Sequence, residues 1–490
     1  MIELLLATVL IPVFGVSALL IYKAMSRSEN LDIVKIITGT TYFASFFTSL
    51  MLLKDFSKTK TGFQGYIKKD WIPSIGAHFE VGIDRISIAL FVLTTFLGIC
   101  VFIYSLGEKK KQQALFYICL LLLQVGMLGT FVALDLLLFF ACFELVLIPM
   151  FFLINIWGGE NRSYSAMKFF TFTMAGSGLM LIGFLAIYII GGRTFSITEI
   201  NLTQDSFGEI SRGFIFIILF LGFAIKVPIF PFHTWLPFAH TDAPTEGSVL
   251  LAGIMLKMGV YGIIRIAMPF MSTSNGVFEK ILGLLAVISI IYGAFCSWAQ
   301  DDIKKLIAYS SVAHMGYVML AISTNSTEGI NAAIFGSVAH GLISGLLFFI
   351  CGSLSHRYHT RSLQKLSGLA KKIPKFSWIA MLAIFASLGI PGLAGFWGEF
   401  GAILQSYSYG TTTFKIYAFV GAVGTLFAGV YMMKIISSSL YGETTDLVEN
   451  SEATDLTAFE WIVFVPMAAL IVVFGVAPAI LTSYLLVGGL

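Results

Sequence analysis

Fourteen long apolar stretches follow one another along this chain, and each could cross a lipid bilayer as an α-helix. A membrane-spanning helix needs about 20 mostly apolar residues. Hydrophobic residues make up 57% of the 490 residues and charged residues only 12%, a balance that water-soluble domains of this length do not have. The sequence therefore predicts an all-α polytopic membrane protein with about 14 transmembrane helices. The expected spans are residues 3–22, 33–53, 81–106, 114–132, 134–157, 165–190, 213–239, 246–270, 277–299, 303–323, 329–355, 376–406, 412–441 and 459–486.

The span 213–239 combines a central lysine, Lys226, with prolines that begin at Pro228. A lysine at the bilayer centre costs about 2.5–3.5 kcal/mol on insertion scales, so it must be buried against protein, a partner charge or water. Pro228 has no backbone N–H to donate and should break the helix, which membranes tolerate only beside protein or a wet cavity. We therefore expect an ion path here, with His233 and His240 near the mouth of a cavity.

Two further charges lie deep within expected spans. Glu144 is near the middle of its span, and its side chain is too short to reach the membrane surface. A purely structural alternative for Glu144 is a carboxylate that is hydrogen-bonded, or paired with Lys226, for packing alone. Lys257 sits among small residues in the middle of the expected span 246–270. Its structural alternative is a long side chain that reaches an interface, as lysine often does.

The position of Glu399 depends on where the long stretch 376–406 is interrupted. Several glycines and Pro391 precede it and predict a second broken helix. If the spanning part is 387–407, Glu399 is central. If the spanning part is 376–396, Glu399 is an ordinary loop residue.

His314 and His340 lie at similar depths in two consecutive spans. A lone histidine on an apolar face is usually a core residue. Two histidines on adjacent helices, with Ser310, Ser311 and Tyr317 close by in the sequence, make a proton relay as reasonable as a packing role. Both interpretations stay open at this stage.

Other kinds of function find no support in the sequence. There is no P-loop, no dinucleotide-binding glycine fingerprint and no cluster with metal-ligand spacing, so we expect no cofactor in this chain. The five cysteines lie in apolar runs without Cys-x-x-Cys spacing and read as core residues. A net charge of +3 gives no indication of nucleic-acid binding. The energy for any transport should therefore come from an ion gradient or a partner.

Basic residues indicate the orientation in the membrane. An even number of spans puts both termini on one side. One set of alternate loops and their flanks holds 17 lysines and arginines, including Lys304 and Lys305, and the other set holds 9. The positive-inside rule therefore predicts that both termini lie on the non-cytoplasmic side.

The two proline-broken spans lie in different halves of the chain, a pattern typical of inverted repeats around an ion site. We expect three N-terminal helices in residues 1–112, one five-helix repeat in 113–270, a second in 271–441, and a final loop and helix in 442–490.

Three segments closely resemble the antiporter-like membrane subunits of respiratory complex I. They are Asp135–Ile154, which contains Phe-Glu144-Leu-Val-Leu-Ile-Pro; Ala224–Val249, which contains Ile-Lys226-Val-Pro; and Lys305–Gly316, which contains Ser-Ser-Val-Ala-His314. The resemblance covers nearly the whole chain and implies two inverted five-helix repeats. It also implies roles: Glu144 and Lys226 as an ion pair, Lys257 as the central relay, Glu399 facing the exit side, and His314 and His340 as intervening relays.

The resemblance implies a proton-translocating subunit of an NADH:quinone oxidoreductase in a bacterial inner membrane. FMN, iron–sulfur clusters and quinone would belong to partner subunits, and the neighbours would be L-type and N-type antiporter-like subunits in the same bilayer. Those types carry a lysine where Glu399 stands, and the L-type adds a long lateral helix, so this chain is most similar to the M type. Two alternatives stay open: a subunit of a Na⁺/H⁺ antiporter, and a structural spacer whose charges only hold helices together.

Overall fold

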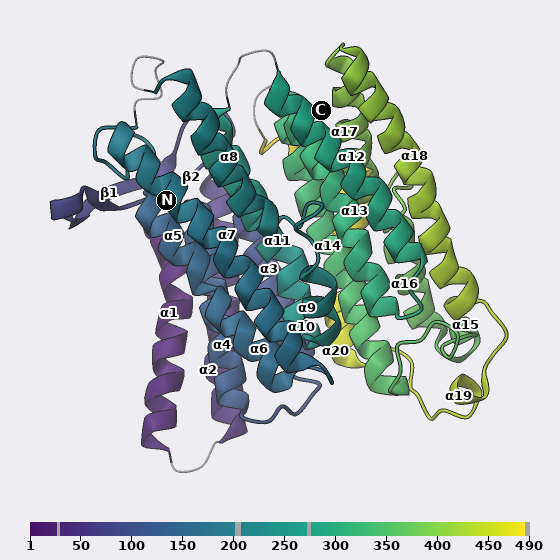
Figure 1. The fold of residues 1–490 in the computed structure, drawn as a ribbon. Coiled ribbons are helices and arrows are strands. Elements are labelled where there is room, and N and C mark those ends of the chain that lie inside the picture. Colours follow the sequence, from purple (N-terminus) through teal and green to yellow (C-terminus); the bar gives the residue numbers. More distant parts are fainter. Residues whose placement is uncertain (27–29, 201–206, 272–275, 486–490) are drawn as a thin grey trace. The chain divides into compact units, whose positions relative to one another are not determined.

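The computed structural model describes residues 1–26, 30–200, 207–271 and 276–485. Within these residues, twelve helices are long and apolar enough to cross a membrane. The other two expected spans are the broken ones, 213–239 and 376–406, and each is built from two shorter helices. The predicted polytopic helical membrane fold is therefore confirmed (Figure 1).

The described chain forms two compact units. The first contains Met1–Val227 and Ile254–Gly276. Its elements are α1 (Ile2–Met25), α2 (Leu31–Asp55), β1 (Gln64–Ile72), β2 (Ala77–Ile83), α3 (Ile88–Ser105), α4 (Gln113–Val132), α5 (Leu136–Leu145), α6 (Leu147–Trp157), α7 (Arg162–Ile190), α8 (Glu209–Lys226) and α11 (Leu256–Gly262).

The second unit contains Pro228–Gly253 and Val277–Leu490. Its described helices are α9 (Leu236–Asp242), α10 (Thr245–Leu250), α12 (Val277–Trp298), α13 (Ile303–Ser323), α14 (Thr327–Tyr358), α15 (Leu369–Lys372), α16 (Pro374–Ser387), α17 (Ala394–Ser408), α18 (Thr412–Ile435), α19 (Asp446–Glu449), α20 (Ala458–Val476) and α21 (Ala479–Thr482).

Both predicted helix breaks are present. Helix α8 ends at Lys226, two residues before Pro228, and the chain turns before α9 begins. Helix α16 ends at Ser387. Gly389 and Gly392 then adopt φ angles of +78° and +93°, a conformation that L-residues with a side chain rarely adopt, before α17 begins at Ala394. Glycines therefore permit the break between α16 and α17, whereas a proline starts the break between α8 and α9.

Two further helices are interrupted. The expected span 134–157 is divided into α5 and α6 at Val146. Pro149 explains this division, because its ring has no N–H for the carbonyl of Leu145 and clashes with it. The stretch Thr245–Phe270 is helical, but two π-helical turns, Leu251–Met255 and Ile263–Ala267, flank the short helix α11. The site residue Glu144 lies beside the first of these interruptions and Lys257 lies on α11.

Three sequence-based boundaries are wrong. The expected helix 81–106 begins only at Ile88, and its first residues belong to β2. The loop 54–80, expected to be a simple cap, forms the antiparallel hairpin β1–β2 at the end of α1 where the chain begins (Figure 1). The last long helix stops at Val476 rather than 486, since the residue before Pro478 is restricted to extended conformations.

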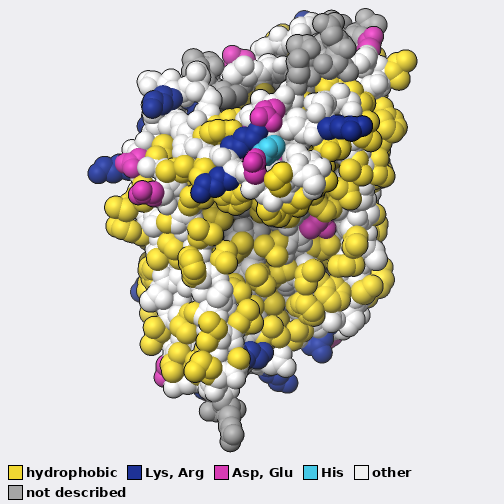
Figure 2. Space-filling model, turned by 90° about the vertical axis from the view of Figure 1, so that its left-hand side faces the viewer, with side chains coloured by type: hydrophobic (Ala, Val, Ile, Leu, Met, Phe, Trp, Pro, Cys, Tyr) yellow, Lys and Arg dark blue, Asp and Glu magenta, His cyan; other side chains and the backbone are white. Residues whose placement is uncertain are grey.

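The outer surface fits a bilayer. Figure 2 shows one face on which hydrophobic side chains fill a broad band, while charged side chains gather mainly above and below it. Exposed apolar residues on α1 and α2, such as Phe14, Ile21 and Phe47, contribute to the hydrophobic surface of the first unit. An apolar band of this kind is what lipid chains contact.

Candidate functional site

In the first unit, Glu144 lies in the last turn of α5, next to the Pro149 interruption. Its carboxylate accepts a hydrogen bond from the hydroxyl of Ser177 on α7. Lys226, the last residue of α8, is only 3% exposed, and its ammonium lies 4.6 Å from the centre of the Phe143 ring. A cation over an aromatic face is stabilised by the ring's negative charge density. Phe143, which directly precedes Glu144 on α5, is therefore the aromatic partner of Lys226.

The resemblance to antiporter-like subunits implies an ion pair between Glu144 and Lys226. Within the described residues, however, the two side chains form no direct salt bridge. Each has a different partner: the carboxylate has Ser177 and the ammonium has Phe143. Glu144 and Lys226 are therefore separate in this conformation.

Lys257 is fully buried on α11, so it does not reach an interface in the way that the structural alternative requires. Helix α11 passes very close to α8. A methyl group added to Gly259 would lie 2.8 Å from a methyl carbon of Val227 and 3.1 Å from Cβ of Lys226. The helix that carries Lys257 therefore packs directly on the helix end that carries Lys226.

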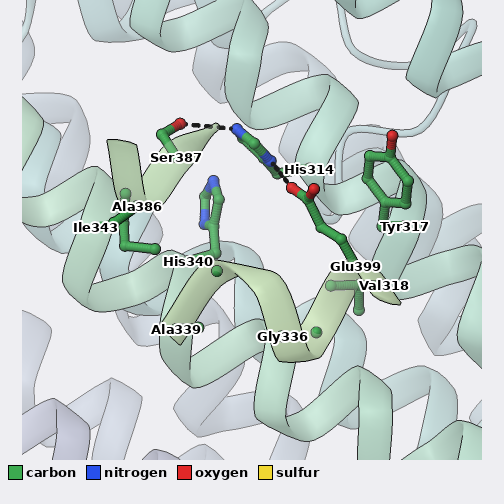
Figure 3. A pocket seen from close by; sticks show the side chains of 12 residues that line it. His314, Tyr317, Val318, Gly336, Ala339, His340, Ile343, Ala386, Ser387 and Glu399 are labelled. Atoms are coloured by element: carbon green, nitrogen blue, oxygen red, sulfur yellow. Dashed lines mark hydrogen bonds and ion pairs between the residues drawn. The ribbon is translucent and has the colours of Figure 1, made fainter. Parts of the chain in front are cut away.

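In the second unit, His314 connects three helices (Figure 3). From α13, its Nδ1 lies 2.8 Å from Oε1 of Glu399 on α17, and its Nε2 lies 3.0 Å from the hydroxyl of Ser387 at the end of α16. The hydroxyl of Tyr431 lies 3.5 Å from the same Nε2. Because α16 and α17 are the two halves of the broken span, His314 binds both sides of the break.

Glu399 is a helix residue of α17 and is 9% exposed, so of the two sequence-based alternatives the loop position is excluded. Its second oxygen, Oε2, is buried and has no hydrogen-bond partner among the described residues. This oxygen points toward Gly389, where an added methyl group would lie 2.9 Å away. Half of the carboxylate is therefore available to water or to a proton.

A cavity of about 30 Å³ lies beside these groups, between His314, His340, Ser387, Tyr317 and Glu399 (Figure 3). Since one water needs about 10–15 Å³ of such space, there is room for about two. The rings of His314 and His340 have their centres 5.7 Å apart. The sequence predicted both histidines, and the structure brings them to the same cavity as Glu399.

This arrangement can hold and pass a proton. A neutral imidazole has one N–H and one acceptor nitrogen, while a serine hydroxyl can donate or accept. Ser387 therefore accommodates His314 whichever nitrogen carries the proton. An ionised Glu399 accepts a hydrogen bond from Nδ1–H, and a protonated Glu399 donates one to bare Nδ1. A proton can move along this 2.8 Å contact without any helix moving.

His233 and His240 differ from the expectation of a cavity mouth, because both are buried against aromatic rings. His233 contacts Phe230 and Tyr292, and His240 stacks on Phe348 with ring centres 4.4 Å apart. Sequence reasoning did not single out Ser177, Ser387 or Phe143. Ser387 alone had a local signal, because it directly precedes the glycine- and proline-rich break.

Membrane-spanning helices with two breaks, and with buried lysines, carboxylates and histidines beside them, define an antiporter-like polytopic membrane protein. More narrowly, the chain belongs to the family described as NADH:quinone oxidoreductase/Mrp antiporter, transmembrane, whose profile matches residues 133–474.

Individual relatives agree with this assignment. The chain is 37% identical to the NADH-quinone oxidoreductase subunit M of Rickettsia conorii over 473 residues, which cover 96% of this chain and 95% of that protein. It is 36% identical to the protein of the same name from Escherichia coli K12 over 419 residues, 83% of this chain and 81% of the relative.

Solved structures show the same fold. A chain of respiratory complex I from Thermus thermophilus with bound NADH has a TM-score of 0.86 at 26% identity, covering 98% of this chain and 97% of that one. A chain of the Mrp complex from Dietzia has a TM-score of 0.84 at 19% identity, with 99% and 96% covered, a likeness in fold alone.

Proposed function

We propose that this chain is a proton-translocating membrane subunit of an NADH:quinone oxidoreductase. It moves protons across the membrane through its buried charges, and electron transfer from NADH to quinone in other subunits supplies the energy. The observation that carries the proposal is the contact of His314 with Glu399 beside a cavity large enough for water. The names of the relatives, NADH-quinone oxidoreductase subunit M, support the same conclusion.

In the first unit, the proton is held by Lys226 and Lys257. When the carboxylate of Glu144 approaches Lys226, it stabilises the protonated amine, and when it withdraws to Ser177 the lysine can release its proton. The separate partners of the two side chains support this alternation. In the second unit, His340, His314 and Glu399 act as successive proton carriers, with Glu399 on the exit side.

The work must come from a partner. Moving one elementary charge against 100 mV takes about 2.3 kcal/mol. FMN, iron–sulfur clusters and quinone are therefore assigned to other subunits, and the neighbours in the membrane are the L-type and N-type antiporter-like subunits. The protein spans the inner membrane of a bacterium, with both termini on the non-cytoplasmic side and with two inverted five-helix repeats in residues 113–270 and 271–441.

The assignment to a redox complex is tested by purification. An affinity-tagged chain extracted in mild detergent should bring with it flavin and iron–sulfur proteins that oxidise NADH. The competing function, a subunit of a Na⁺/H⁺ antiporter, is favoured by the likeness in fold to the Mrp complex. A complex that lacks flavin and iron–sulfur proteins and exchanges Na⁺ for H⁺ would establish that alternative.

The spacer alternative is tested with Glu144→Gln and Lys226→Met. Both substitutions keep the approximate size of the side chain and remove its charge. If Glu144 and Lys226 carry protons, the complex with either variant should assemble but pump fewer protons. If the chain is only a structural spacer, less complex should assemble, and the complex that does assemble should pump normally.

A further inference from the structure

Lys304 is a buried lysine outside the groups described above. It is the second residue of α13, close to a helix end from which a lysine side chain usually reaches solvent. Yet Lys304 is only 6% exposed, while its neighbour Lys305 is exposed. The sequence-based count of loop charges treated both as surface residues. The side chain of Lys304 instead points into the second unit.

The surroundings of Lys304 compensate its charge only in part. Its ammonium donates a hydrogen bond of 2.6 Å to the carbonyl oxygen of Ala243, just after the C-terminal end of α9. The nearest carboxylate in sequence, Asp302, is paired with Arg361 at 3.1 Å instead and caps the first turn of α13. Arg361 itself donates to the carbonyl of Thr241. Within the described residues, Lys304 forms no salt bridge and no second hydrogen bond.

A lysine ammonium has three N–H donors, and burial without matching acceptors disfavours the charged form. The groups whose charges act on Lys304 come from every side: Asp302 before its own helix, Asp242 at the end of α9, Cys351 on α14 and Arg361 after α14. One of these is a fixed positive charge and two are carboxylates. Two of the three N–H donors of Lys304 therefore have no acceptor among the described residues.

Lys304 also lies on the helix that carries His314. The two residues are ten positions apart, which is about 15 Å along an α-helix. Ser310 and Ser311 occupy the turn before His314, and both are buried. A second cavity, of about 10 Å³, is lined in part by Ile303 and Ile307 of the same helix.

Ser439 also lines this second cavity, and its buried hydroxyl has no hydrogen-bond partner among the described residues. The other residues that line this cavity are apolar, so a water there would find fewer polar partners than the roughly 2–4 that a buried water usually has. Between Lys304 and His314, helix α13 carries two buried hydroxyls, those of Ser310 and Ser311.

We propose that Lys304 is a further proton-carrying residue of the second unit. Its amine takes a proton from water at the end of α13 marked by Asp302 and Arg361, and the ammonium later gives this proton to water on the His314 side. Only N–H and O–H bonds of these groups form and break. The inference rests on the proposed function, because it adds a carrier to the same proton path.

The test uses the assembled complex carrying Lys304→Met or Lys304→Arg, with Lys305→Met as the matched control. Protons pumped per electron pair, NADH oxidation and the amount of assembled complex are measured together. We expect Lys305→Met to pump like the natural protein. Both Lys304 variants should assemble but lose most of their pumping, since methionine carries no proton and a guanidinium does not release one.

The contradicting results are distinct. Lys304→Met that pumps normally would overturn the inference. Restored pumping in Lys304→Arg alone would also overturn it, because a residue that only holds Ala243 needs a cation rather than an exchangeable proton. Glu399→Gln, measured in parallel, separates the two levels: normal pumping in Glu399→Gln contradicts the proposed function itself, whatever the Lys304 variants do.

Discussion

Replacing Gly293 by alanine should disturb the packing that holds His314 in place. Gly293 lies on α12, and a methyl group added there would lie 2.8 Å from the backbone nitrogen of Ala313, the residue before His314. An ordinary contact needs at least 3.4 Å, so α12 and α13 must separate by about 0.6 Å. A backbone atom cannot rotate away as a side-chain atom can.

The free energy of the substitution follows from two opposing terms. Overpacking a well-packed contact costs about 1–3 kcal/mol. Alanine in place of glycine inside a helix regains roughly 1 kcal/mol. We therefore expect Gly293→Ala to lower the free energy of unfolding by about 0–2 kcal/mol, which places it about 1–3 kcal/mol below a glycine-to-alanine change without overpacking. If the whole displacement reached His314, its 2.8 Å contact with Glu399 would become a weak hydrogen bond, so pumping should fall as well.

Gly429→Ala is the matched control, because nothing lies within 4 Å of a methyl group added at this position of α18. This variant should be as stable as the natural protein or slightly more stable. The assay is unfolding of the purified full chain in detergent, followed by circular dichroism, together with pumping by the assembled complex. Equal stability and equal pumping in the two variants would refute the packing argument.

Two other substitutions have equally specific expectations. Arg357 on α14 forms two hydrogen bonds of 2.6 Å with the buried carboxylate of Glu460 on α20, so Arg357→Met should cost about 3–5 kcal/mol and reduce the yield of folded chain. The double variant Arg357→Met with Glu460→Leu should recover much of this loss, because no buried charge is left unpaired. A single variant as stable as the double one would contradict this expectation. Gly389→Ala and Gly392→Ala both strain a left-handed backbone, but only Gly389→Ala also crowds Glu399. At similar stability, the complex with Gly389→Ala should therefore pump fewer protons than the complex with Gly392→Ala. Equal pumping would show that Glu399 tolerates the contact.

The membrane fold and the central charges could be predicted from the sequence because the free energy of placing a segment in the bilayer depends mainly on that segment's own residues. An apolar run of sufficient length has few alternatives to a spanning helix. A residue such as Lys226 in the middle of one stands out without any knowledge of its neighbours. Pro228 likewise breaks its helix through its own covalent structure.

What the sequence could not supply are the partners of these charges. That Glu144 meets Ser177, or that His314 meets Ser387, depends on which helices pack together and at what rotation. The hairpin was not predicted because it depends on the pairing of β1 with β2 across a turn. The hydropathy of a single segment contains no information about such pairing. Lys304 was placed at the surface because sequence position fixes the helix end but not the direction of the side chain.

The most direct test of the account is the number of protons pumped per electron pair by the assembled complex carrying Glu399→Gln. Glutamine keeps the size of the side chain and can still hydrogen-bond to His314, but it cannot take up a proton. The account predicts a complex that assembles and oxidises NADH yet pumps fewer protons than the natural one. An undiminished proton count would contradict the claim that protons pass through these buried charges.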